Sequence, residues 1–116
     1  MRASSSACIC SLLATLAPLA LASCVGLVPV PTPADAAWAQ AAYPGVTVAQ
    51  LADDRRLYIG KCAGCHTLYP VDHVDEDSWD AAVDAMVEKG RIERADQARI
   101  VRYLVTASHA VSVRPR

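Results

Sequence analysis

Cys62, Cys65 and His66 form a C-x-x-C-H sequence near the middle of this chain of 116 residues. Two thiols with two residues between them can reach the two vinyl groups on one edge of a haem ring and bind them as thioethers. The histidine that follows places its imidazole under the ring, where it can bind the iron. Gly64 leaves room for the backbone to pass close to the porphyrin. The motif therefore predicts one covalently attached haem, with His66 as the proximal iron ligand.

Two other kinds of site use similar cysteine spacing. A thioredoxin-like C-x-x-C needs a β-α-β setting, and no alternating strand pattern flanks Cys62 and Cys65. A zinc site of the two-pair kind needs a second pair of cysteines or histidines, whereas His73 and His109 lie far apart in the sequence. Haem attachment is therefore the favoured interpretation.

The first 23 residues are typical of an export signal. Arg2 precedes an apolar run, residues 7–21, that is short for a membrane-spanning helix and contains a proline. The run ends in Leu-Ala-Ser-Cys24, which resembles the lipobox of bacterial lipoproteins. This resemblance implies cleavage before Cys24 and a lipid on that cysteine. An ordinary secretory signal, cleaved after residues 20–22 or 34–36, and an uncleaved N-terminal anchor remain open.

The two motifs account for all five cysteines. Cys8 and Cys10 leave with the signal, Cys24 carries lipid, and Cys62 and Cys65 carry haem. Covalent haem attachment is expected outside the cytoplasmic membrane, so the motifs agree on location. We expect an exported protein, lipid-anchored to a bacterial membrane and facing the periplasm or the cell exterior. Several acyl chains on one residue would hold it there stably.

Residues 24–46 have the composition of a linker. Prolines at positions 29, 31 and 33, followed by Pro44-Gly45, disfavour helices and strand ladders and favour an extended polyproline-like chain. At ~3.1 Å per residue, some twenty residues would reach on the order of 60 Å from the membrane. Trp38 and Tyr43 are unusual in a linker, and their simplest explanation is that this end folds back on the domain that follows.

Residues 47–113 are expected to form the folded domain, with residues 114–116 as a tail. Thr47 can cap a first helix that ends near Gly60, because Leu51 and Tyr58 continue a helical spacing up to the cysteines. A second helix is expected over residues 78–89, with Gly90 in the left-handed position after its last turn. A third is expected over about residues 94–108, with frayed residues beyond 110. The pattern predicts an all-α fold.

Residues 57–66, LYIGKCAGCH, resemble the N-terminal helix of small class I cytochromes c as it runs into the haem attachment site. Ile100 with Tyr103-Leu104 resembles the last helix of that family. The resemblance implies about three helices around one covalent haem, with Tyr58 and Tyr103 as neighbours where the terminal helices cross. The family usually has a glycine four residues before the first aromatic, where this chain has Asp54. The resemblance also implies that a proline carbonyl, here that of Pro70, binds the free nitrogen of the proximal histidine.

Met86 is the candidate for the second axial ligand. It shares one face of the second helix with Trp79, Val83 and Val87, and it is the sole methionine after Met1. In the class I family the ligand methionine also lies between the attachment site and the last helix. A methionine on an apolar face can instead only fill space. His73 as the ligand would give a bis-histidine haem of lower potential, and no ligand would leave the iron open to a small molecule.

Charge is segregated along a chain whose net charge is only −1. Acidic residues gather between positions 72 and 84 and basic residues between 91 and 102. This pattern predicts orientation during docking with redox partner proteins, and not nucleic-acid binding. The short loop after His66 suggests that Ala63, Leu68 and Tyr69 form the rim of the haem site.

These observations together predict a small monohaem cytochrome that carries single electrons and is not an enzyme. Two alternatives stay open. One is a haem enzyme or small-ligand sensor whose sixth position is open or bound by histidine. The other is a fixed cytochrome subunit of a larger redox complex.

Overall fold

The computed structural model describes residues 28–114, and every regular element in that range is helical. The elements are α1 (Pro33–Ala39), α2 (Val48–Cys62), the 3-10 turn η1 (Glu76–Ser78), α3 (Trp79–Asp84), α4 (Val87–Gly90) and α5 (Arg94–Val113). The predicted all-α class is confirmed. The predicted signal, Cys24 and the last two residues lie outside the described range. Within that range, no helix combines the length and the apolar character that crossing a membrane requires.

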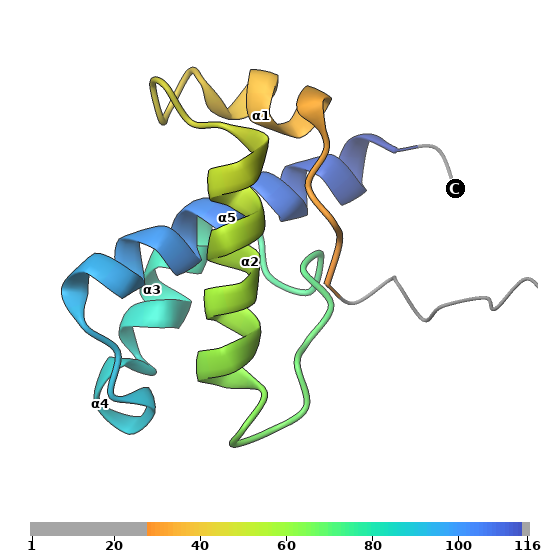
Figure 1. The fold of residues 1–116 in the computed structure, drawn as a ribbon. Helices are drawn as coiled ribbons and strands as arrows, with labels where there is room; N and C mark the ends of the chain where they lie inside the picture. Colours follow the sequence, from red (N-terminus) through yellow and green to blue (C-terminus); the bar gives the residue numbers. More distant parts are fainter. Residues whose placement is uncertain (1–27, 115–116) are drawn as a thin grey trace, which may run out of the picture.

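The two longest helices, α2 and α5, cross each other and organise the fold (Figure 1). Helix α2 begins at Thr47 as predicted, because the Thr47 hydroxyl accepts the Gln50 N–H while the Gln50 side chain accepts the Thr47 N–H. Where the helices meet, the ring centroids of Tyr58 and Tyr103 are 5.8 Å apart. The predicted contact between these two tyrosines is confirmed.

Asp54 holds the same crossing together by charge. Its side chain is 1% exposed, and its two oxygens accept hydrogen bonds from Arg99 Nε at 2.9 Å and from Arg102 Nε at 2.7 Å. A buried carboxylate is stable only when it is paired, and α5 supplies both partners from consecutive turns. Asp54 is thus the centre of a buried ion-pair cluster at the helix crossing.

The core is built around α5. One cluster of buried side chains joins α5 to α2, to α3 and to the loops before α3 and α5: Tyr58, Val71, Trp79, Val83, Ile92, Ile100, Tyr103, Leu104 and Ala107. A second, smaller cluster joins α1 to the start of α2 through Ala36, Ala39, Val46 and Leu51. The larger cluster lies beside the C-x-x-C-H motif, because Cys62 packs against it, and the smaller one lies under α1.

Residues 28–46 differ from the extended tether that their composition suggests. Thr32 and Asp35 form a capping box, and Pro33 occupies the first turn of α1, where its missing N–H costs nothing. Ala36 and Ala39 then bury one face of the helix. The capping residues in the sequence T-P-x-D therefore start a helix despite the high proline content of this stretch. Trp38 and Tyr43 had already suggested that this stretch folds back on the domain.

Long-range polar contacts fix this N-terminal stretch to the domain. The Tyr103 hydroxyl donates a hydrogen bond to the Pro29 carbonyl at 2.8 Å, and Arg55 Nε donates one to the Val28 carbonyl at 3.1 Å. Arg114 lies 3.0 Å from the Asp35 carboxylate, so the end of α5 is paired with α1. The folded unit therefore includes the first described residues, Val28 and Pro29.

The single helix predicted for residues 78–89 is interrupted. It is replaced by η1, α3 and α4, with a turn at Ala85 and Met86 in which the Met86 N–H bonds to the Val83 carbonyl, three residues back. Arg91, and not Gly90, takes the left-handed conformation, at φ 49°. Gly90 instead lies close to the Ile92 side chain, which a Cβ at this position would approach to 3.0 Å. Helix α5 starts at Arg94 as expected but continues to Val113, beyond the predicted end.

Candidate functional site

The C-x-x-C-H motif lies at the end of α2. Cys62 is the last residue of the helix, and the chain then turns, with the Cys65 N–H 3.5 Å from the Cys62 carbonyl. Cys62 is half-buried against the core, whereas Cys65 is exposed, and both are free thiols. Burial, with a smaller effect of Cys65, raises the pKa of the Cys62 thiol. The helix end thus holds one thiol against the core and presents the other to solvent.

A cavity of about 230 Å³ opens beside this motif. Its walls come from α2, the loop after His66, α3, the turn before α4, and α5: Tyr58, Cys62, His66, Tyr69, Val74, Trp79, Ala82, Val83, Met86, Ile92 and Leu104. The size is close to the lower end of small-molecule sites, roughly 300–1,000 Å³, and the lining has their mostly apolar character. Tyr69 is 59% exposed and lies at the open rim.

Three of the residues singled out from the sequence meet in this cavity. Cys62, His66 and Met86 come from α2, from the loop after it and from the turn between α3 and α4, yet all three line the same hollow. Cys65 lies beside it in the attachment turn and is not part of the lining. Met86 is 39% exposed, so its thioether lies at the rim and not deep in the core. The interruption of the predicted helix at Met86 is what places it on this turn.

The imidazole of His66 is held from one side. Its Nδ1 lies 2.8 Å from the Thr67 carbonyl oxygen, so a proton on Nδ1 is donated there and the lone pair of Nε2 is free to bind a metal. The carbonyl of Pro70 was expected in this role. In the structure it accepts the N–H of His73 at 3.0 Å instead, because the chain turns immediately after Pro70.

Neither of the other two histidines lines the cavity. His73 is exposed and stacks on Tyr69, with ring centroids 5.5 Å apart. His109 stacks on Trp38 at 3.9 Å, and its Nδ1 lies 3.3 Å from a Glu76 oxygen. His109 thus joins α5 to α1 and η1.

Trp79 and Tyr58 also line the cavity, although the sequence did not indicate that either belongs to the site. The indole Nε1 of Trp79 is buried and finds no hydrogen-bond partner among the described residues. Burial raises the pKa of Tyr58 to about 12, so its phenol is neutral at ordinary pH. Two sequence signals could have indicated that these residues belong to the site. Trp79 shares an inward helix face with Val83, and Tyr58 lies one helical turn before Cys62.

Within residues 28–114, no group of three or more His, Cys, Asp or Glu side chains could hold a metal ion by itself. Comparisons with protein-family models, with curated proteins and with solved structures find no match to this chain. What the site can do must therefore be argued from its own residues.

Proposed function

We propose that this protein is a lipid-anchored, monohaem c-type cytochrome that transfers single electrons. The observation that carries the proposal is the apolar cavity in which Cys62, His66 and Met86 meet. These are a thiol for covalent attachment and the two side chains that serve as axial ligands in His/Met haem proteins, and they converge from three separate segments. Cys65 would provide the second covalent bond.

The cavity suits haem in two further respects. Its lining is mostly apolar, so it would give the ring a low-dielectric surrounding and exclude water from one side. The unpartnered Nε1–H of Trp79 is a donor for which a carboxylate of the haem periphery would be an acceptor. Because the enclosed volume is small and Tyr69 and Met86 lie at the rim, an edge of the ring would stay open to a partner.

Each of these residues would have a separate role in holding haem. Bound haem would supply a one-electron couple at its iron. Cys62 and Cys65 would fix the ring to the end of α2, and the Thr67 carbonyl would keep Nε2 of His66 oriented as a ligand. Met86 would close the other side through its sulfur. With Cys62, His66 and Met86 engaged by haem, most of the remaining lining would be apolar, which suits a carrier whose partners are other redox proteins.

Export and anchoring complete the proposal. The apolar N-terminus and the lipobox-like sequence before Cys24 support a lipid anchor on a bacterial membrane, with the domain in the periplasm or at the cell surface. Covalent haem attachment in the same compartment agrees with this location.

Visible spectroscopy on the protein matured with haem tests the site. Haem should remain attached after denaturation in the wild type and be released from a Cys62→Ser, Cys65→Ser variant. The ferric protein should show the weak far-red band of a sulfur–iron bond, and Met86→Ala should lose it. His73→Ala is the matched control and should retain the band. High-spin ferric iron in the wild type, with ready carbon monoxide binding after reduction, would overturn the carrier function.

One observation favours a second candidate function. Met86 is 39% exposed and lies on a turn between two short helices, so its sulfur is easily displaced. A haem protein that binds a small ligand in the sixth position, or exchanges Met86 for His73, would use such a turn. The carbon monoxide experiment separates the two functions, because a stable His/Met carrier binds the gas slowly or not at all.

A further inference from the structure

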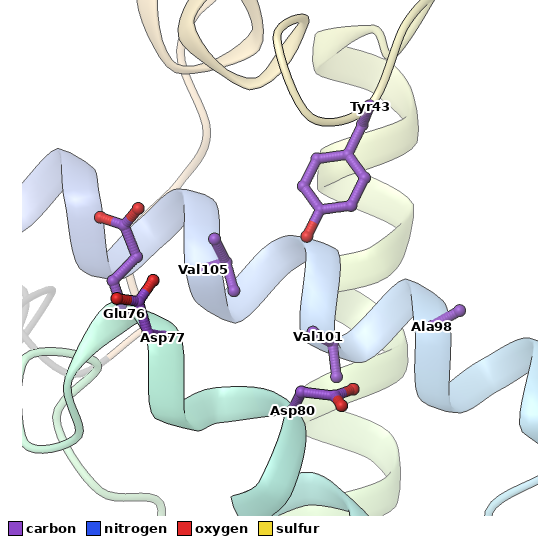
Figure 2. Close-up of a pocket in the computed structure, with 7 residues that line it drawn as sticks. All are labelled: Tyr43, Glu76, Asp77, Asp80, Ala98, Val101 and Val105. Atoms are coloured by element: carbon purple, nitrogen blue, oxygen red, sulfur yellow. The ribbon is translucent and has the colours of Figure 1, made fainter.

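A second hollow lies against a different face of α3 and α5 from the candidate haem cavity. Trp79 of α3 and Leu104 of α5 line the haem cavity, whereas their neighbours Asp80 and Val105 line this groove of about 450 Å³. Figure 2 shows the groove, with the Tyr43 ring reaching toward α5 from the loop before α2 and three carboxylates on the other side. Its lining comprises Tyr43, Glu76, Asp77, Asp80, Ala98, Val101 and Val105.

The floor and the wall of the groove differ in character. Ala98, Val101 and Val105 of α5 make an apolar floor, while Glu76, Asp77 and Asp80 carry the negative charge. Glu76 is paired with His109. Asp77 and Asp80 are exposed and make no ion pair with another described residue. The groove thus combines an apolar strip with uncompensated negative charge along one side.

The carboxylates of Asp80 and Glu76 affect the Tyr43 phenol on the other side of the groove. Burial raises the pKa of its phenol most strongly, Arg102 opposes this, and Asp80 and Glu76 raise the pKa further. The phenol is therefore neutral and can donate a hydrogen bond, and its ring face can attract a cation. An aromatic ring opposite two carboxylates over an aliphatic floor matches the parts of a long cationic side chain.

We propose that this groove is a docking site for a lysine or arginine side chain from a basic segment of a partner protein. The aliphatic stem would lie on Val101 and Val105, and the charged head would reach Asp77 and Asp80. A metal ion fits less well, because within the described chain no group of three such side chains could hold one. This docking site does not depend on haem, since none of its residues belongs to the cavity.

Amide NMR with a defined peptide tests the site on the full chain. The probe is acetyl-Lys-Leu-Lys-Leu-Lys-amide, with the glutamate peptide Glu-Leu-Glu-Leu-Glu as the negative control. The lysine peptide should shift resonances of residues 76–80, 98–105 and Tyr43, and the shifts should weaken as salt is added. The double variant Asp77→Asn, Asp80→Asn should weaken binding by about tenfold, because it removes two charge-assisted contacts.

Two further variants separate a built site from general attraction. Asp72→Asn with Glu88→Gln removes the same charge at exposed positions outside the groove and should change the affinity by less than about twofold. Ala98→Lys places a cation inside the groove from an exposed helical position and should abolish the shifts while the helical circular dichroism is kept.

Three results would overturn the proposal. Equal weakening by the groove pair and the control pair would show unspecific attraction, and so would binding that survives Ala98→Lys. Shifts of the same groove residues on raising the protein concentration, with dimers in sedimentation equilibrium, would assign the groove to a second copy of this chain.

Discussion

Replacing Asp54 with asparagine should destabilise the fold by about 2 kcal/mol. The substitution keeps the size of the side chain and removes its negative charge. Breaking a buried ion pair by removing one partner costs about 3–5 kcal/mol, because the other charge is left without compensation. Here the remaining partners are partly solvated, since the side chains of Arg99 and Arg102 are 42% and 23% exposed. Water would recover part of the loss, which reduces the expected cost to about 2 kcal/mol.

Urea unfolding followed by helical circular dichroism measures this loss. With a slope of about 2 kcal/mol per molar urea, the midpoint should fall by about 1 M. Asp53→Asn is the matched control, because Asp53 is the adjacent residue of α2 and its pair with Arg56 is exposed on both sides. That variant should lose no more than about 1 kcal/mol.

A double-mutant cycle identifies the cause. Asp54→Asn and Arg102→Gln should together cost less than the sum of their separate effects, by about 1 kcal/mol, because the second change removes a charge that the first has already left unpaired. Additive effects, or an Asp54→Asn variant as stable as Asp53→Asn, would refute the view that the ion-pair cluster holds the helix crossing.

Two further predictions concern the backbone and the pH dependence of stability. Arg91→Gly should stabilise the protein by about 0.5–1 kcal/mol in the same urea assay, because φ is 49° at this position, while Arg56→Gly inside α2 should destabilise it by about 1 kcal/mol; a neutral Arg91→Gly would contradict this. Burial raises the pKa of Tyr58 to about 12, so above pH 10 the unfolded chain releases a proton that the folded chain keeps. Stability should therefore fall as the pH rises from 10 to about 12, by about 1.4 kcal/mol per pH unit from this residue, and an unchanged slope in Tyr58→Phe would refute this origin.

The parts of the fold that were predictable rest on local signals. Thr47 with Gln50 caps a helix through neighbouring residues alone, and the spacing of Tyr58 before the cysteines carries the resemblance that placed it beside Tyr103. The turn at Met86 was not predictable in this way. Its apolar spacing fits an unbroken helix, and no local signal in the sequence marks the turn at Ala85 and Met86.

Long-range partners explain the other differences. Asp54 is an acid in a helix, and its burial depends on two arginines that lie more than forty residues later in the sequence. Helix α1 had a local signal in Thr32 and Asp35, but its docking depends on the stack of Trp38 on His109 and on the pair of Asp35 with Arg114. For the site, the sequence indicated Cys62, His66 and Met86, and their common cavity is a structural finding; the haem itself stays a prediction.

In the proposed lipid-anchored form, the docking of α1 would limit the distance at which the protein meets its partners. Because the described fold already includes Val28, four residues after Cys24, a lipid on Cys24 would hold the domain within at most about 14 Å of extended chain from the membrane. A carrier of the proposed kind, on so short a connection, would search by lateral diffusion in the plane of the membrane and not through the volume above it. Its electron donors and acceptors should then expose their redox groups within roughly one domain diameter of the lipid surface.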